Sequence, residues 1–308
     1  MIYRGFFWLA LLASCGTFPA GAADARRVVV YTSQDQVYAE PMLKSFERQT
    51  GIPVAAVYDS EAVKTVGLAN RLLAEKAHPQ CDLFWSNEEL RTRQLAAQQV
   101  FRETNGWVAV GYRSRRIVIN TNLLAASLAP KRWVELTNQV WRGKVALAYP
   151  LFGTTATHFL ALRQRWGTPA WESWCRALAA NQPFLVDGNS VAAKLVGRGE
   201  AWIGLTDSDD IAAEQRHGAP VAPLAMTDET LLIPNTIAVI RRGPNPAGAQ
   251  VLWEYLQRPA ITDKLIVARA LEGRAAGEVT APGLKPEWDL ILTELDPATT
   301  ILKKVFLR

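Results

Sequence analysis

The sequence predicts an α/β protein made of two units, each a mostly parallel sheet flanked by helices. From Arg27 onward, short runs of β-branched residues alternate with amphipathic segments. The alternation starts again near Val108, and a late strand at 236–240 with a helix at 246–257 looks like a return to the first unit. A strict β-α-β-α-β order favours parallel strands covered by helices.

The first unit is expected to contain three strands, each followed by a helix. Valine-rich runs suit pleated strands, and Gly51 is typical of a helix end. In chain order the expected segments are strand 28–31, helix 37–49, strand 54–57, helix 61–76, strand 81–85 and helix 88–98.

The second unit is expected to repeat this alternation. A loop through Pro130 and a tryptophan-bearing segment ending at Lys144 interrupt its early part. The expected strands are 108–112, 117–120, 145–148, 184–186 and 202–205. Helices should begin at Thr155, Val191 and about Asp209.

Residues 1–23 differ from the rest of the chain. Arg4, the apolar block 6–13 and the small residues ending at Ala22 have the order of a secretory signal. Leu12-Ala13-Ser14-Cys15 also resembles a lipobox, so a lipoprotein anchored at Cys15 is the alternative to cleavage after Ala22. Both interpretations predict an exported, periplasmic protein.

Composition limits the function classes. The 308 residues are 49% hydrophobic and 20% charged, which is typical of a globular chain long enough for two domains. The net charge of +5 is spread without a basic run, so we expect no nucleic-acid partner. Cys81 and Cys175 lack metal-type spacing and are expected to be buried single thiols.

Polar loops follow the expected strands, at the sheet edge where ligands of α/β proteins bind. They are 32–35, 86–89, 152–155, 187–190 and 206–210. Helix capping explains part of this pattern, with Ser86 and Glu89 fitting a capping box. The three carboxylates Asp207, Asp209 and Asp210 are more than one helix cap requires. A cation or a hydrogen-bond donor facing them would relieve their mutual repulsion.

The loop Gly153-Thr154-Thr155 favours an anion, whereas the acidic cluster favours a cation. A glycine followed by two hydroxyls at a helix start offers N–H and O–H donors to an anion, although a plain threonine cap is the alternative. Donor and acidic loops across one cleft would suit a metal ion with a bound anion, or a zwitterion.

Several segments together resemble the periplasmic substrate-binding proteins of bacterial ABC importers, in their ferric-iron-binding branch. The resemblance covers nearly the whole chain after the signal, and its segments are 28–31, 46–52, 82–85, 111–115, 141–145, 189–192 and 199–200. It implies a two-lobed type 2 periplasmic-binding-protein fold with crossover strands, a hinge, and permease and ATPase partners. The lobes implied are 24–113 with 233–275, and 114–232 with 276–308.

The resemblance also implies a ligand set. Asp209-Asp210 stand where iron-binding relatives have a tyrosine pair, and Asp35 and Asn87 lie near the positions of a histidine and a glutamate. The anion-holding positions match Gly153 to Thr155 and Asn189. Ferric iron held by Asp35, Asp209 and Asp210 with a bound anion is therefore the expected cargo, because hard cations take oxygen ligands; no cofactor is required.

The predicted ligand-binding set combines these loops. Its members are Ser33, Asp35, Trp85, Asn87, Glu88, Gly153, Thr154, Thr155, Asn189, Asp207, Asp209 and Asp210. The alternative ligand is a small organic solute such as an aminophosphonate, a phosphorylated compound or a polyamine. Stacking of a sugar on Trp85 is a further option, while Trp171 and Trp174 at helical spacing are expected in the core.

An exported hydrolase is the alternative of another class. His78, His158 and His217 are scattered, and neither G-x-S-x-G nor H-E-x-x-H occurs. His158 lies one helical turn beyond Thr154 and could approach the cleft, or pack as an ordinary histidine. We therefore expect a binding protein and no enzyme.

Overall fold

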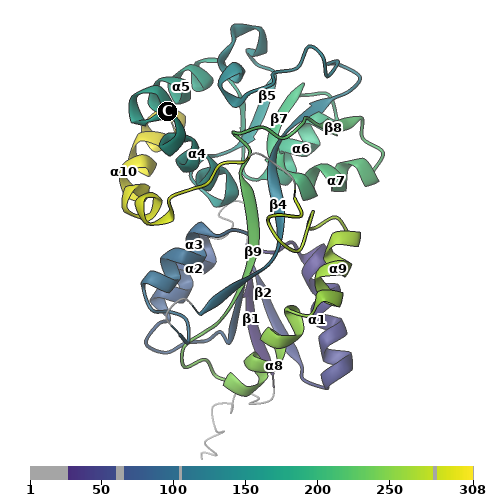
Figure 1. The fold of residues 1–308 in the computed structure, drawn as a ribbon, viewed down its shortest axis with the longest axis vertical. Coiled ribbons are helices and arrows are strands. Elements are labelled where there is room, and N and C mark those ends of the chain that lie inside the picture. Colours follow the sequence, from purple (N-terminus) through teal and green to yellow (C-terminus); the bar gives the residue numbers. More distant parts are fainter. Residues whose placement is uncertain (1–26, 60–65, 104–105, 280–282, 308) are drawn as a thin grey trace, which may run out of the picture.

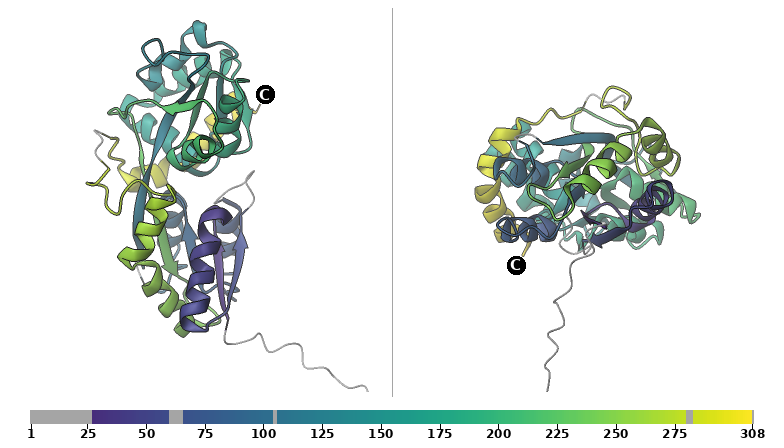
Figure 2. Two further views of the ribbon diagram at one scale, coloured as in Figure 1. Left: turned by 90° about the vertical axis from the view of Figure 1, so that its right-hand side faces the viewer. Right: turned by 90° about the horizontal axis from the view of Figure 1, so that it is seen from below.

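The computed structural model describes residues 27–59, 66–103, 106–279 and 283–307. Two lobes lie one above the other and are linked by the long strands β4 (Trp107–Asn120) and β9 (Leu232–Val239) (Figure 1). The side view shows these connecting strands passing between the lobes (Figure 2). The predicted signal segment and Cys15 lie outside the described residues.

The sheet runs through both lobes. Its strand order is β2 (Val54–Tyr58), β1 (Val28–Thr32), β3 (Leu83–Ser86), β9, β4, β7 (Ile203–Asp207), β5 (Val145–Ala148) and β6 (Phe184–Val186), and β8 (Val221–Pro223) pairs with β4. Strand β1 pairs in parallel with β2 and β3, and β5 pairs in parallel with β6 and β7. The antiparallel pairs all involve β4 or β9, so each lobe has the parallel sheet that the sequence predicts.

The lower lobe contains the first third of the chain and a later segment, 246–267, that comes back to it. Its elements are β1 (Val28–Thr32), α1 (Gln36–Thr50), β2 (Val54–Tyr58), α2 (Val66–Ala74), β3 (Leu83–Ser86), α3 (Leu90–Ala97), α8 (Pro246–Leu256) and α9 (Pro259–Val267). Helix α1 ends as predicted, because Gly51 has a φ of 71° and its N–H binds the carbonyl of Glu47.

The upper lobe contains the middle of the chain and the last helix. Its elements are the short 3-10 helices η2 (Trp133–Thr137) and η3 (Gln139–Trp141), β5 (Val145–Ala148), α4 (Gly153–Trp166), α5 (Thr168–Ala180), β6 (Phe184–Val186), α6 (Asn189–Gly197), β7 (Ile203–Asp207), α7 (Ser208–Arg216), β8 and α10 (Trp288–Phe306). Helices α4 and α6 begin two residues earlier than predicted, at Gly153 and Asn189.

Strand β4 corrects the prediction of two separate strands at 108–112 and 117–120. It is one strand of 14 residues with a bulge between Ala109 and Tyr112. Gly111 lies inside the bulge with a φ of 143°. The polar stretch between the two apolar runs suggested a break, but its charged side chains are paired inside the protein, as described below.

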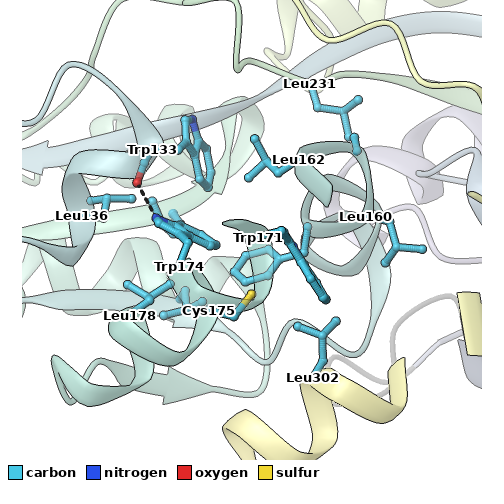
Figure 3. Packing of buried hydrophobic residues seen from close by; sticks show 14 of the residues in the cluster. Trp133, Leu136, Leu160, Leu162, Trp171, Trp174, Cys175, Leu178, Leu231 and Leu302 are labelled. Atoms are coloured by element: carbon cyan, nitrogen blue, oxygen red, sulfur yellow. Dashed lines mark hydrogen bonds between the residues drawn. The ribbon is translucent and has the colours of Figure 1, made fainter. Parts of the chain in front are cut away.

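Tryptophans fill the core of the upper lobe. Trp133, Trp171 and Trp174 are buried, and the indole N–H of Trp174 donates to the carbonyl oxygen of Trp133 at 3.1 Å (Figure 3). This confirms the core position predicted for Trp171 and Trp174. Cys175 in this core and Cys81 in the lower lobe are buried free thiols, as expected. Within the described ranges, none of the helices combines the length and apolarity needed to cross a membrane.

Candidate functional site

A polar pocket lies where β5, β6 and β7 end. Its volume is about 410 Å³ including the part open to solvent. The carboxyl edge of a parallel sheet is where helix N-termini converge and ligands bind. The lining residues are Asn87, Arg113, Ala148, Tyr149, Phe152, Gly153, Thr154, Thr155, Asp187, Gly188, Asn189, Asp207 and Asp210.

Two helices point their N-termini at this pocket. Helix α4 begins at Gly153, whose φ is 54°, and α6 begins at Asn189. Neither N-cap residue, Phe152 or Gly188, makes a side-chain capping hydrogen bond. Because first-turn N–H groups have no partner inside their own helix, both helix ends offer backbone donors and a positive dipole end to the pocket.

Three carboxylates line the start of the third helix, α7. Asp207 ends β7, and Asp209 and Asp210 lie in the first turn of α7. All three are buried, and carboxylate oxygens of the three lie within 4.8 Å of one another. The sequence correctly places this acidic cluster beside the threonine-bearing loop, because the Thr154 hydroxyl donates to Asp207 Oδ2 at 2.8 Å.

Two arginines of β4 compensate this charge. Arg113 and Arg115 are both buried, and their alternating positions put them on one face of the strand. Arg115 lies opposite Asp207 in the β4–β7 register and binds its Oδ1 at 2.7 Å. Arg113 binds Asp207 Oδ2 at 3.1 Å and also pairs with Asp209. The cation that the acids require is therefore supplied by the protein itself.

The pairing shifts the pKa values of both partners. Burial alone would lower the pKa of Arg113, but Asp209, Asp207 and Asp210 raise it above its ordinary value. Burial alone would raise the pKa of Asp207, but Arg113 and Arg115 bring it below its ordinary value. Both groups are thus held in their charged forms.

The threonine hydroxyls belong to the same network. Thr155 Oγ1 donates to Asn189 Oδ1 at 2.9 Å, and Asn189 Nδ2 donates to Thr154 Oγ1 at 2.9 Å. Arg115 Nη1 donates to Asn189 Oδ1 at 2.8 Å. The O–H donors that the sequence suggests for a ligand are therefore engaged internally. Gly153 and Asn189, where α4 and α6 begin, line the pocket.

The predicted residues of the lower lobe contribute differently. Ser33 Oγ donates to Asn87 Oδ1 at 3.1 Å and accepts from Asn87 N at 3.0 Å, and Arg113 Nη2 donates to the Asn87 carbonyl at 3.1 Å. Asp35 is the half-buried N-cap residue of α1, and its charge also raises the pKa of Arg113. Trp85 is fully buried in the lower-lobe core rather than on an open wall.

The predicted capping box of Ser86 and Glu89 is wrong. Glu88 caps α3 instead, accepting from Leu90 N at 2.6 Å and Arg91 N at 2.9 Å. Its carboxylate also accepts from Thr157 Oγ1 of the upper lobe at 3.3 Å. Glu88 therefore both caps α3 and links the two lobes through its hydrogen bond with Thr157.

The pocket therefore unites seven predicted residues: Asn87, Gly153, Thr154, Thr155, Asn189, Asp207 and Asp210. Ser33, Asp35, Trp85, Glu88 and Asp209 are not among its lining residues. Sequence analysis missed the role of Arg113, as well as Asp187, Tyr149 and Phe152. One signal for Arg113 and Arg115 is present in the sequence. They stand at alternate positions beside an apolar strand, and carboxylates that could pair with them occur elsewhere in the chain.

His158 is a packed residue, which was the simpler of the two expectations. Its ring lies 4.0 Å from the Trp133 ring, and Nε2 is 2.7 Å from the Glu229 carbonyl. Burial and the charge of Arg115 lower its pKa to about 3. The histidine is therefore neutral and lies outside the pocket.

Two α/β lobes linked by crossing strands, with a polar pocket at the strand ends, define a solute-binding protein of the kind that captures ligands outside the cytoplasm. Residues 27–265 match the bacterial extracellular solute-binding protein family. The chain belongs to this family, whose members are binding proteins.

The known proteins to which this chain is similar are described with different ligands. The major ferric iron-binding protein of Neisseria meningitidis is 26% identical over 210 residues, which are 62% of this chain and 61% of that protein. Iron-bound HitA from Pseudomonas aeruginosa superposes with a TM-score of 0.78 at 19% identity, covering 91% of this chain and 99% of HitA. AfuA from Actinobacillus pleuropneumoniae, with fructose-6-phosphate bound, has a TM-score of 0.75 at 18% identity, covering 90% and 97%. These likenesses confirm the type 2 periplasmic-binding-protein fold.

Proposed function

We propose that this protein captures a small phosphorylated organic solute between its lobes and delivers it to an ABC permease in the bacterial inner membrane. One observation carries the proposal: the N-termini of α4 and α6 and the buried Arg113 line the same pocket. Converging helix N-termini and a guanidinium are a natural site for a phosphoryl group.

The internal ion pairs argue against a bare cation as the ligand. A metal ion bound by Asp207 and Asp209 would have to displace Arg113, and a buried guanidinium without a counter-ion is strongly unfavourable. A phosphoryl group bound at the N-termini of α4 and α6, here called the α4–α6 cradle, leaves those ion pairs intact. The internal pairs therefore favour a ligand held at the starts of α4 and α6 over a cation held by Asp207 and Asp209.

Two carboxylates that line the pocket indicate which polar groups the solute carries besides its phosphoryl group. Asp187 and Asp210 line the pocket, and Asp210 Oδ2 accepts from Thr206 Oγ1 at 2.9 Å. Carboxylates accept hydrogen bonds from sugar hydroxyls or from an ammonium group. Sugar phosphates such as the fructose-6-phosphate of AfuA, and aminophosphonates, have both features.

Ferric iron with a bound anion is the second candidate. It is supported by the clustering of Asp207, Asp209 and Asp210 and by the iron-binding names of several relatives. In that case the anion would bind at the N-termini of α4 and α6. Asp210 and Asp35 would provide oxygen ligands to the iron.

The remaining assignments follow from the same function. The lobe boundaries, export through residues 1–23 and release into the periplasm, or anchoring at Cys15, are parts of this proposal. Closure around a solute that touches both lobes would favour the closed state, because a ligand stabilises the state in which it makes more contacts.

Calorimetric titration tests the ligand class. Fructose 6-phosphate, inorganic phosphate, unphosphorylated fructose and ferric citrate are compared at one ionic strength. We expect phosphorylated ligands to bind and fructose to fail. Binding of ferric citrate without binding of any phosphorylated compound would reject the proposal in favour of iron.

A glycine pair gives matched variants for this titration. Gly153→Ala distorts a left-handed residue at the start of α4 and should weaken binding about tenfold, since hydrogen bonds to charged groups contribute about 1.5–3 kcal/mol. Gly143→Ala has the same backbone problem, with a φ of 67°, but lies outside the pocket lining and should leave affinity unchanged.

A further inference from the structure

The C-terminal end of α7 contacts the lower lobe. Arg216 Nη2 donates to the hydroxyl of Tyr38 on α1 at 2.7 Å, and Arg216 Nη1 donates to the Ala268 carbonyl after α9 at 3.0 Å. Figure 1 shows α7 of the upper lobe above α9 and α1 of the lower lobe, on one flank of the crossing strands. One guanidinium thus joins three helices from both lobes.

The acceptor on the lower lobe is fixed in place. Tyr38 is 5% exposed and packs in the lower-lobe core, and it presents its hydroxyl and one ring face to Arg216, whose guanidinium carbon lies 5.7 Å from the ring centroid. Burial raises the pKa of this phenol, and the charge of Asp209 adds to the rise while Arg216 opposes it. The phenol is therefore neutral and accepts from Arg216 with an oxygen that its packed ring holds in position.

The same helix reaches the pocket at its other end. Asp210 in the first turn of α7 lines the pocket, and Asp209 pairs with Arg113 of the crossing strand. Helix α7 has nine residues and runs from the pocket to the Tyr38 contact. A rotation of the upper lobe relative to the lower lobe would move both ends of α7 together.

We infer that Arg216 and Tyr38 form a latch that stabilises the arrangement seen here, in which α7 contacts the lower lobe and which we call closed. The consequence for ligand retention rests on the proposed function, whereas the effect on lobe closure does not. The latch couples the pocket to closure through α7. Arginine suits this position because its two Nη groups reach two acceptors at once, which a lysine ammonium does with less defined geometry.

The test measures the distance between the lobes in the ligand-free protein. Spin labels on Lys44→Cys of α1 and Lys194→Cys of α6 report it, in protein produced from residue 24 onward, whose native cysteines, Cys81 and Cys175, are buried. Arg216→Ala removes both contacts and Tyr38→Phe removes the hydroxyl alone. Arg198→Ala, which removes an exposed arginine from the same lobe, is the matched control.

We expect Arg216→Ala and Tyr38→Phe each to raise the ratio of open to closed molecules about two- to fivefold, the range for partly exposed charged contacts. The double variant should show no more than the larger single effect, and Arg198→Ala should match the wild type. Identical distance distributions in wild type, Arg216→Ala and Tyr38→Phe would overturn the latch. Tyr38→Phe keeps the packed ring, so it decides the question even if Arg216→Ala fails to fold.

The dissociation rate of the bound solute is measured in a separate experiment. If a phosphorylated solute binds, its dissociation rate should rise about two- to fivefold in both latch variants. If no phosphorylated solute binds but the label distances change, the proposed ligand is wrong and the latch stands. If the solute binds and neither distance nor dissociation rate changes, the latch is wrong and the proposed function stands.

Discussion

At the scale of single residues, the site is governed by charge compensation inside the protein. Four buried charges, on Arg113, Arg115, Asp207 and Asp209, contact one another within one sheet edge. Removing one partner of a buried pair leaves a charge without solvation, so each of these residues is expected to be important for stability as well as for binding.

Arg115→Met should lower the free energy of unfolding by about 3 kcal/mol, because Asp207 and the Asn189 side-chain oxygen lose a donor. Urea unfolding measures the change. Arg198→Ala, an exposed arginine, should stay within about 0.5 kcal/mol of wild type. Equal effects of the two substitutions would show that the buried ion pairs contribute nothing to stability.

His158 makes a prediction about pH. Its pKa in the folded protein is about 3, against about 6.5 in an unfolded chain. Between these values the unfolded state binds a proton that the folded state does not, so stability falls as pH decreases, by roughly 1.4 kcal/mol per pH unit from this group. His158→Gln should remove this part of the slope in urea unfolding between pH 6.5 and 4. An unchanged slope would mean that His158 is protonated in the folded protein.

At the scale of elements, the sequence predicted most strands and helices where hydrophobic periodicity is strong. Strand β2, helix α8 and the end of α1 lie within a residue or two of expectation. Helix α10 was not anticipated, since Pro297 interrupts its helical pattern and its stability comes from packing on the upper-lobe core. The sequence predicts two strands in place of β4, because arginines inside a sheet can be recognised only when the carboxylates that pair with them are known.

The bulge of β4 depends on Gly111. A Cβ there would lie 2.4 Å from Leu271 Cδ1 and 3.2 Å from the Gly273 carbonyl, at a φ that L-residues rarely adopt. Gly111→Ala should therefore destabilise the protein by about 2 kcal/mol, through strain and displaced core atoms. Thermal or urea unfolding measures this. Gly277→Ala, where nothing lies within 4 Å, is the control, and equal stability of both variants would contradict the account.

At the scale of the whole molecule, the proposed function depends on the two lobes and on the pocket at the ends of β5, β6 and β7. Three of the loops that the sequence predicts at strand ends line one pocket in the structure, because strand ends in parallel sheets converge. Sequence analysis assigned the acids to a ligand cation because the pairing of Arg113 and Arg115 with them spans about 90 residues of chain and has no local pattern. Our proposal of a phosphorylated solute in preference to a metal ion rests on these ion pairs.

A crystal structure of the protein grown with fructose 6-phosphate, or with whichever phosphorylated solute binds most tightly, tests the central claim most directly. We predict phosphoryl oxygens within hydrogen-bond distance of the N–H groups at the starts of α4 and α6, with the pairs of Arg113 to Asp207 and Asp209 intact. A phosphoryl group bound elsewhere, or a ligand held by Asp209 and Asp210 after displacement of Arg113, would contradict this account.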